Sequence, residues 1–325
     1  MEDAPPIEVR GLVKRYREIV AVDGVDLTIN PGDVFGYLGP NGAGKTTSLR
    51  MMLGLIRPTA GRVRLFGRDP QFSVRALEGV AGFVEAPTFY PYLSGRANLE
   101  LYAALDRGDG AARIDEVLET VDLRDRAKDK VKGYSHGMRQ RLGIASALLR
   151  EPRLLLLDEP TTGLDPAGMR DMRGLVRDLG ERGITVLLSS HLMPEVEELC
   201  NRVAIIRSGR IAYEGSLDEL RSRAGITYRL RTTDDVLAGR ICAAQADLED
   251  AEPDGSAGLR FKARGEDAVA ALSLALAEAG TAILELTPRQ ASLEEVFFQL
   301  TEGATQPPES DRPRDEIEAA ARARS

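Results

Sequence analysis

The stretch of residues 39–46 has the residue types and the spacing needed to hold phosphate groups. It reads Gly-Pro-Asn-Gly-Ala-Gly-Lys-Thr and fits the P-loop pattern. Gly42 and Gly44 let the backbone curl so that successive N–H groups face one point, and the helix that follows aims its positive end there. Lys45 adds a positive charge for the β- and γ-phosphates, and Thr46 offers a hydroxyl to Mg²⁺. These residues predict a nucleoside triphosphate site.

Two adjacent carboxylates, Asp158 and Glu159, follow the apolar run Leu-Leu-Leu-Leu. Phosphoryl transfer needs mainly positioning and charge neutralisation, and acids at the end of a buried strand supply both. We expect Asp158 to hold Mg²⁺, usually through water, and Glu159 to polarise the attacking water. Two acids could also mark an ordinary surface turn, but the preceding P-loop favours the phosphoryl-transfer interpretation.

The elements that must position these residues alternate between strands and helices from residue 7 to about residue 220. Some stretches alternate apolar and polar residues, as half-buried strands do, and others are almost wholly apolar, as strands buried on both faces are. Strands are expected at residues 7–13, 25–29, 33–38, 154–157 and 184–188, and a helix at residues 45–55.

Three further regions differ in pattern from these core elements. Between about residues 93 and 150 the sequence becomes helical, and we interpret this region as a helical subdomain inserted between core strands. Residues 226–302 predict a small α+β domain, whose final helix opens with a capping box from Ser292 to Glu295. Residues 304–325 carry three prolines among mixed charges, which predicts a disordered tail.

Composition limits the classes of partner. The chain has 325 residues and a net charge of −8, which argues against a broad nucleic-acid-binding face because such faces are basic. Its two cysteines, Cys200 and Cys242, have no metal-ligand spacing, which favours a reduced, cytosolic protein. No stretch approaches the ~18 apolar residues that cross a bilayer. If the protein serves a membrane, we therefore expect it to do so from outside the bilayer.

Five motifs in order carry a family resemblance. They are the P-loop, Tyr-Ser-His-Gly-Met-Arg-Gln-Arg from Tyr134, the acidic pair at Asp158, Thr-Gly-Leu-Asp-Pro from Thr162, and Ser-Ser-His from Ser189. This set resembles the nucleotide-binding domain of ABC transporters over residues 7 to about 220. The resemblance implies an α/β fold: a P-loop NTPase domain of the ABC ATPase type with an inserted helical subdomain, here followed by the small C-terminal α+β domain.

The resemblance also implies a site completed by a second subunit. In the family, the segment that begins at Ser135 forms a second anion site for the γ-phosphate held by a partner, and Asp165 lies in the loop that crosses the interface. Because the chain has one P-loop and one such segment, a head-to-tail dimer, most simply a homodimer, is expected. His191 matches the histidine that contacts the γ-phosphate. Tyr16 lies where the family stacks an aromatic on adenine, although a loop tyrosine could also simply pack.

The implied cofactors are ATP and Mg²⁺, and the implied residues fall into three groups. The catalytic residues are Lys45, Glu159 and His191, and the Mg²⁺ ligands are Thr46, Asp158 and Glu85. The residues expected to bind ATP are Tyr16, Gly39, Pro40, Asn41, Gly42, Ala43, Gly44, Lys45, Thr46, Thr47, Glu85, Ser135, His136, Gly137, Met138 and Asp165.

Two positions depart from the family pattern. Glu85 stands where the family usually has a glutamine that senses Mg²⁺ and touches the membrane partner. A carboxylate can still ligate Mg²⁺, but it adds negative charge to the segment that touches the membrane partner in the family. The segment at Ser135 reads Tyr-Ser-His-Gly-Met, whereas the family more commonly has Leu-Ser-Gly-Gly-Gln. Ser135 and Gly137, at the positions that bind the anion in the family, are retained. We expect the chain to remain competent in hydrolysis.

Two stretches, residues 85–99 and the end of the small C-terminal domain, resemble the ATP-binding subunits of bacterial drug and antibiotic exporters of the bacitracin and daunorubicin resistance type. The resemblance implies an ATPase that powers efflux through a separate permease from the cytoplasmic face of the membrane, with Phe89, Tyr90 and Tyr92 in the surface that docks the permease. The alternative for these three aromatic residues is local packing within the helical subdomain. Alternatives are a soluble ABC ATPase in a non-transport role and the motor of a lipid or polysaccharide exporter. The C-terminal domain is expected to stabilise a dimer or to bind a partner rather than to sense a ligand.

Overall fold

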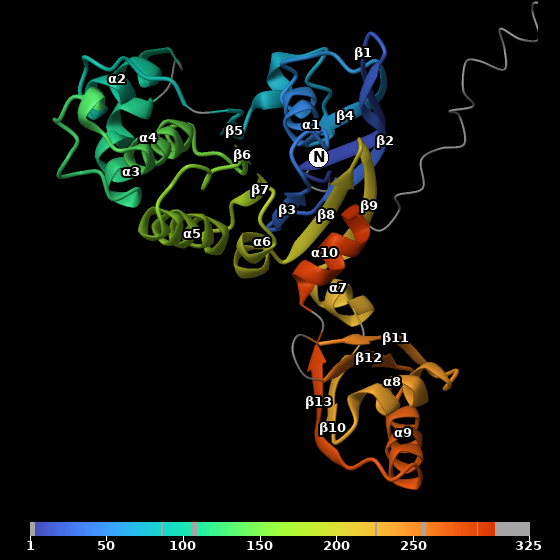
Figure 1. Ribbon diagram of the computed structural model, residues 1–325. Helices are drawn as coiled ribbons and strands as arrows, with labels where there is room; N and C mark the ends of the chain where they lie inside the picture. The colour runs from blue at the N-terminus through green and yellow to red at the C-terminus, as the bar shows by residue number, and fades with distance from the viewer. Residues whose placement is uncertain are drawn as a thin grey trace, which may run out of the picture.

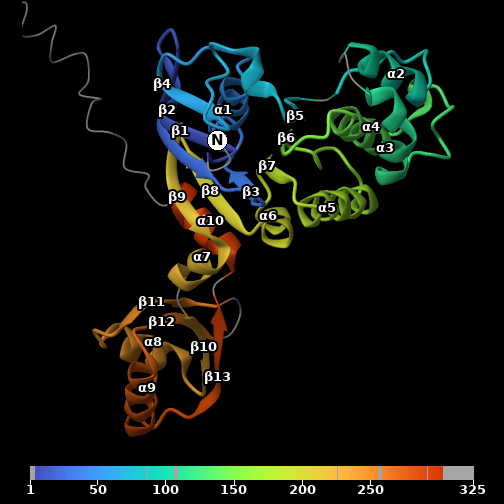
Figure 2. The same cartoon turned by 180° about the vertical axis from the view of Figure 1, so that it is seen from behind.

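The computed structural model describes residues 4–85, 87–105, 109–224, 226–254, 258–290 and 292–302. A core containing the amino-terminal strands has a helical lobe on one side and a small sheet domain at its far end (Figures 1 and 2). The predicted tail at residues 304–325 lies outside the described residues. Within the described part of the chain, no helix is long and apolar enough to cross a membrane.

The centre of the core is a six-stranded sheet in the order β5-β6-β7-β3-β8-β9. Its strands pair in parallel except for the last pair, β8 and β9, which is antiparallel. The strands are β3 (Val34–Leu38), β5 (Val80–Phe83), β6 (Leu154–Asp158), β7 (Thr185–Ser190), β8 (Arg202–Arg207) and β9 (Arg210–Ser216).

The apolar run of β6 is buried on both faces of this sheet, as predicted. Leu155 and Leu157 belong to the hydrophobic cluster on the helical side, whereas Leu154 and Leu156 belong to the cluster on the opposite side. Successive side chains of a strand point to opposite faces, so a strand covered on both faces has no position for a polar residue until it ends. The first carboxylate of the chain's acidic pair therefore comes at the end of the strand.

A second, three-stranded antiparallel sheet covers one side of the core. Its order is β2-β1-β4, with β1 (Ile7–Tyr16), β2 (Ile19–Ile29) and β4 (Ala60–Leu65). Helix α1 (Lys45–Met52) packs against β2, β4 and β6, and its residues Leu49, Met51 and Met52 share one buried cluster with both sheets. The helix that follows the P-loop is thus fixed between two sheets.

The helical lobe accounts for residues 93–150 and is followed by two helices of the core. It contains α2 (Gly95–Leu105), α3 (Ile114–Thr120), α4 (His136–Leu148) and the short 3₁₀ turns Asp109–Arg113 and Val131–Gly133; another 3₁₀ turn, Val74–Leu77, precedes β5. Helices α5 (Pro166–Glu181) and α6 (Met193–Leu199) pack against each other and against β7. Buried residues of α4, α5 and α6 belong to one cluster, which joins the lobe to the core sheet.

The small carboxyl-terminal unit, called here the accessory domain, is a four-stranded antiparallel sheet with two helices. After α7 (Leu217–Ala224), the elements are β10 (Ile226–Thr232), α8 (Asp235–Ala243), β11 (Leu248–Pro253), β12 (Leu259–Ala263), α9 (Glu266–Glu278) and β13 (Ile283–Gln290), in the sheet order β11-β12-β10-β13. Leu272 and Leu276 of α9 and Cys242 of α8 pack on Leu230 and Phe261 of the sheet. The edge strand β11 has no counterpart among the sequence-based predictions.

The last helix, α10 (Leu293–Glu302), returns to the core, although the sequence predicted it as part of the domain at residues 226–302. Leu293, Val296 and Phe297 are buried in the core cluster that also contains Met193 and Val196 of α6. Both views show α10 beside α7 and the end of the core sheet (Figures 1 and 2). The accessory domain is thus inserted between two helices, α7 and α10, that contact each other and both pack on the core.

The capping box predicted at the start of α10 is confirmed. The backbone N–H of Glu295 donates to the Ser292 hydroxyl at 3.2 Å, and the backbone N–H of Ser292 donates to the Glu295 carboxylate at 3.1 Å. The two bonds satisfy amide groups that have no partner within the helix. This defines the point at which the chain leaves the accessory sheet.

Candidate functional site

The predicted chemical groups meet because three neighbouring strands end together. The P-loop follows β3, the acidic pair begins at the end of β6, and His191 follows β7, and these strands are adjacent in the order β6-β7-β3. The carboxyl ends of parallel strands lie at one edge of a sheet, which is where open α/β sheets bind their ligands. A direct bond joins two of these ends, because the N–H of Gly39 donates to the carbonyl of Ser190 at 3.1 Å.

The backbone of the P-loop takes a shape that needs glycine. Gly44 caps α1 with a φ of 108°, and a Cβ atom there would lie 2.4 Å from the carbonyl oxygen of Ala21. Gly42 also has a positive φ, of 80°. Glycine is the residue that adopts this conformation without strain. The two glycines named from the sequence are therefore required by the loop's path as well as by its expected ligand.

The ammonium group of Lys45 folds back onto the carbonyl groups of its own P-loop. The side chain is 5% exposed, and Nζ donates to the carbonyl oxygens of Gly39 at 2.7 Å and Pro40 at 3.2 Å. Nζ also lies 3.2 Å from Oε1 of Glu159. A cation beside a glycine-rich loop at a helix N-terminus is suited to bind phosphate oxygens. In this structure the Glu159 carboxylate provides the negative charge next to it.

Glu159 is the meeting point of the predicted catalytic residues. Its Oε2 accepts a hydrogen bond from the Thr162 hydroxyl at 2.9 Å and lies 3.1 Å from Nδ1 of His191, which must be the donor because a carboxylate only accepts. Burial alone raises the pKa of the Glu159 carboxyl, but the Thr162 hydrogen bond, Lys45 and His191 outweigh it and place the pKa below its ordinary value. Glu159 is therefore ionised at neutral pH.

Asp158 is held rigidly at the end of β6. It is 7% exposed, and its Oδ1 accepts a hydrogen bond from the Ser189 hydroxyl at 2.6 Å. The same hydroxyl accepts the backbone N–H of Glu159 at 2.9 Å. Ser189 thus fixes both members of the acidic pair to β7. Ser189 belongs to the Ser-Ser-His motif, but no role was predicted for it, and its only sequence signal is its place two residues before the histidine.

The oxygen ligands that Asp158 and Thr46 offer fit Mg²⁺. Asp158 supplies a carboxylate and Thr46 a hydroxyl, and Mg²⁺ prefers such oxygen ligands and is usually held by one or two carboxylates with substrate phosphates and water. A cluster of three or more His, Cys, Asp or Glu residues suited to a metal is not found among the described residues, and this kind of site does not need one. The third predicted ligand, Glu85, forms an ion pair with Arg50 in the last turn of α1.

The segment at Ser135 and the loop at Asp165 lie together. Ser135 caps α4 by accepting the N–H of Met138 at 3.2 Å, and Asp165 caps α5 by accepting the N–H of Gly168 at 3.0 Å. His136 joins the two loops, since its Nε2 lies 3.1 Å from the carbonyl oxygen of Thr162. Ser135, His136, Gly137, Asp165 and Gly168 are among the residues that line one hollow. Figures 1 and 2 show α4 in the helical lobe and α1, which begins at the P-loop, on the other side of β6.

Tyr16 lies at the end of β1, where it is 44% exposed. Lys14 Nζ lies 5.0 Å from the centre of its ring, and such a cation can hold an aromatic face in place. The ring is accessible for stacking, and its role with adenine stays a prediction.

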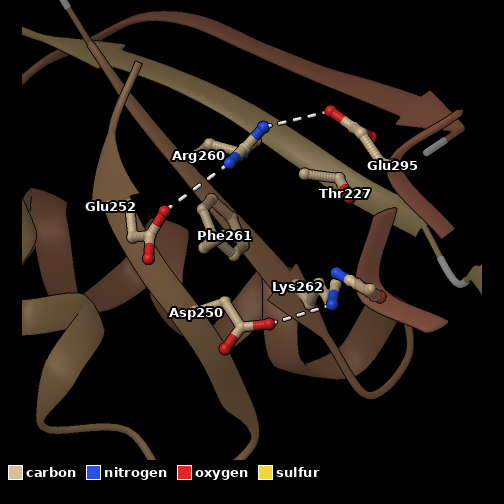
Figure 3. Close-up of a pocket in the computed structure, with 8 residues that line it drawn as sticks. Thr227, Asp250, Glu252, Arg260, Phe261, Lys262 and Glu295 are labelled. Carbon is tan, nitrogen blue, oxygen red and sulfur yellow. Dashed lines mark hydrogen bonds and ion pairs between the residues drawn. The ribbon is translucent and has the colours of Figure 1, made fainter. Parts of the chain in front are cut away.

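A second hollow lies on the accessory sheet (Figure 3). Arg260 lies between Glu252 at 3.5 Å and Glu295 at 3.1 Å, and Lys262 pairs with Asp250 at 2.9 Å. The charges that line this hollow are thus paired with one another, and Glu295 belongs to α10. The arrangement is that of a polar joint between the sheet and α10.

The chain is similar to known proteins over most of its length. Residues 22–162 match the ABC transporter family. The bacitracin transport ATP-binding protein of Bacillus licheniformis is 38% identical over 302 residues, which cover 92% of this chain and 98% of that protein. The daunorubicin resistance ATP-binding protein of Streptomyces coeruleorubidus is 40% identical over 309 residues, 91% of this chain and 95% of that protein. A solved dimeric bacterial ABC transporter cassette, 27% identical, matches with a TM-score of 0.59 over 65% of this chain and 98% of its own.

Proposed function

The chain belongs to the family of ABC transporter ATP-binding proteins, and from this membership we propose that it is the ATP-hydrolysing motor of an exporter of drugs, antibiotics or similar amphipathic molecules. A separate permease provides the channel. The single observation that carries the ATPase part is the meeting of Lys45, Glu159 and His191 at three adjacent strand ends. The export part is supported by relatives whose names state bacitracin transport and daunorubicin resistance, and which match over more than nine-tenths of the chain.

Hydrolysis starts from an exchange of partners at Lys45. Its ammonium contacts Glu159 and two loop carbonyls, and the more highly charged β- and γ-phosphates of ATP would replace them. Glu159 is then an ionised acceptor with His191 hydrogen-bonded to it, placed to orient and polarise the attacking water. Thr46 and Asp158 would hold Mg²⁺, which supplies charge neutralisation at the phosphates. The other P-loop residues would contribute backbone N–H groups, except Pro40, which has none, and Gly39 and Ala43, whose N–H groups donate to the carbonyl oxygens of Ser190 and Pro40. Tyr16 would provide a face for adenine.

The complete site needs a second copy of the chain. The hollow at Ser135 carries a helix N-terminus and a hydroxyl, which together suit an anion, and Asp165 lies on its rim. In a head-to-tail dimer this hollow would receive the γ-phosphate of ATP that is bound to the partner's P-loop. A solved cassette to which this chain is similar is dimeric, which supports the dimer but carries no information on its arrangement.

The permease would dock at the aromatic stretch before α2, on the cytoplasmic face of the membrane. Tyr90 and Tyr92 are 54% and 63% exposed and lie with their ring centres 5.7 Å apart. Phe89 is turned inward and packs edge-to-face on Tyr102 at 5.9 Å. The two tyrosines therefore remain available for a cytoplasmic helix of the permease, while Phe89 supports the lobe.

The ATPase assignment is tested with Glu159→Gln. We expect turnover to fall to background while ATP binding persists and the dimer accumulates, because the amide cannot take over the role of the ionised carboxylate. Steady-state phosphate release and light scattering with ATP measure the two effects. Glu197→Gln, which removes an exposed carboxylate of α6, is the matched control and should behave as wild type. Full activity of Glu159→Gln would exclude the assignment.

The transport assignment is tested by co-purification and by efflux. The chain should co-purify with a membrane permease rather than with ribosomes or DNA. Co-expression with that permease should lower the cellular content of a fluorescent amphipathic drug, and Glu159→Gln should abolish the effect. Co-purification with ribosomes alone would favour a non-transport ABC ATPase instead.

A further inference from the structure

Glu195 is a buried carboxyl group that the mechanism above does not use. It lies in the first turn of α6 and is 2% exposed. Oε1 accepts a hydrogen bond from the Thr161 hydroxyl at 2.6 Å, and Oε2 accepts one from the Ser190 hydroxyl at 2.5 Å. Carboxyl groups are almost never fully buried unless they are paired, because desolvation is costly. Burial accordingly raises the pKa of Glu195, against the effect of the two hydroxyls.

The two hydroxyls belong to the loops that carry the catalytic pair. Thr161 is two residues after Glu159, in the turn that leaves β6, and Ser190 immediately precedes His191 at the end of β7. Both hydroxyl residues are buried, with Thr161 at 3% and Ser190 at 2% exposure. Glu195 therefore joins the two loops from beneath the site.

These bonds close a ring. From Glu159 the chain runs to Thr161, whose hydroxyl bonds Glu195. Glu195 bonds Ser190, the chain runs on to His191, and Nδ1 of His191 returns to the carboxylate of Glu159 at 3.1 Å. Neither loop can shift relative to the other without breaking a bond in this ring. The Ser190 hydroxyl also accepts the N–H of Leu192 at 3.0 Å, which holds the turn after His191.

The turn after β6 needs such a tie. The backbone of Glu159 has a φ of 46°, a left-handed conformation that is uncommon for a residue with a side chain. Such a conformation persists where the surroundings over-determine it. Ser189 fixes the N–H of Glu159 from one side, and Glu195 fixes the following turn through Thr161 from the other.

We propose that Glu195 is a positioning residue for ATP hydrolysis, which fixes Glu159 and His191 relative to each other by bridging Thr161 and Ser190. The inference rests on the proposed ATPase function. Glu195 bonds to neither member of the pair directly in the described contacts, so it acts on the placement of the reacting groups. A misplacement of about 1 Å is enough to cost ~10²-fold in rate. The expected signature is a loss of kcat at an unchanged affinity for ATP.

The test compares three variants in the full-length chain. Glu195→Ala removes both bridges and should lower kcat by ~10- to 100-fold, with little change in KM for ATP or in ATP bound per chain. Glu195→Gln keeps an acceptor and adds a donor of the same size, so it should restore most of the rate. Glu197→Ala on the same helix loses an exposed carboxylate and should match wild type. A Glu195→Ala enzyme with a wild-type kcat per bound ATP would overturn the proposal.

Thr161→Val and Ser190→Ala keep the proposal testable if Glu195→Ala does not fold. Each removes one bridge while it leaves Glu195 in place, and each should lower kcat less than the loss of both. If Glu195 only fastens α6, the variants will lose thermal stability and active fraction in parallel, with kcat per active site unchanged, and the proposal fails. Failure of the ATPase assignment is distinguishable, because Glu159→Gln would then remain active.

Discussion

A lysine meets a carboxylate both in the nucleotide site and in the accessory sheet. Lys45 and Glu159 lie 3.2 Å apart with 5% and 25% of their side chains exposed, whereas Lys262 and Asp250 lie 2.9 Å apart with 30% and 63% exposed. The similar distances conceal different surroundings. An exposed pair contributes ~0–1 kcal/mol because water screens it. A buried ammonium such as that of Lys45 is stable only with an anionic partner, and phosphate groups, which carry more charge than a carboxylate, can replace that partner.

The two regions also differ in how they hold these charges. In the nucleotide site, Lys45 and His191 reach Glu159 from two other strand ends, and Thr162 reaches it from the turn that Glu159 itself begins. In the accessory sheet, Lys262 and Asp250 are neighbours on the adjacent antiparallel strands β12 and β11. Convergence from distant segments fixes groups that must act on one atom. Pairing along neighbouring strands stabilises a solvated surface, and this contrast yields four predictions.

The largest expected effect separates the two lysines. Lys45→Ala should lower ATPase activity by roughly 10²–10³-fold and weaken ATP binding, because it removes a preorganised cation from the phosphate site. Lys262→Ala should leave the turnover rate unchanged and alter stability by less than ~1 kcal/mol. Phosphate release and urea unfolding measure the two quantities. A Lys45→Ala enzyme within a few-fold of wild type would remove the distinction drawn between the two pairs.

The second prediction concerns the boundary between the two regions, at α10. Phe297 is 7% exposed and packs in the ATPase core, whereas Phe298 is 50% exposed. Phe297→Ala should lower the free energy of unfolding by about 3–5 kcal/mol, and Phe298→Ala should lower it by less than ~1 kcal/mol. Urea unfolding followed by circular dichroism measures both. Equal effects would show that α10 does not belong to the ATPase core.

Because α10 packs on the core, an experiment that removes the accessory domain must keep this helix. Truncation at residue 226 would also remove α10 and uncover the buried surface that Leu293, Val296 and Phe297 cover. A variant in which residues 226–291 are replaced by a short flexible linker retains α10, and it should stay folded and hydrolyse ATP. Dimer formation in that variant then reports on the accessory domain alone. Aggregation of the linker variant would indicate that the sheet supports α10.

The smallest expected effect is a pH dependence confined to the accessory domain. Asp235 accepts hydrogen bonds from the backbone N–H and the hydroxyl of Thr232 and from the N–H of Gly258, and these lower the pKa of its carboxyl. A lowered pKa stabilises the fold at pH above the unfolded value of ~3.9. The contribution is lost as the pH falls from there through the folded pKa. Asp235→Asn should therefore flatten the acid limb of the accessory domain's unfolding curve. An unchanged curve would contradict this assignment.

Prediction from sequence succeeded where a short pattern determines a local structure. Three such patterns were recognisable: the P-loop glycines, the apolar runs of β6 and β7, and the capping box at Ser292. In each, a few neighbouring residues determine the backbone conformation or the burial of the segment. The edge strand β11 was missed because it reads Leu-Glu-Asp-Ala-Glu-Pro. Such an acidic segment becomes a strand only because β12 pairs with it, and β-propensity depends strongly on that context.

Residue order along the chain shows which groups are present and which element carries each: Lys45 before a helix, Asp158 and Glu159 after an apolar strand, and His191 after the next. Tertiary structure alone decided that Lys45 contacts Glu159, that Glu195 bridges Thr161 and Ser190, and that α10 closes the ATPase core. The reason is physical. Local patterns follow from backbone geometry and the period of burial, whereas a hydrogen bond between side chains 34 residues apart, as between Thr161 and Glu195, exists only once the strand order has brought their loops together.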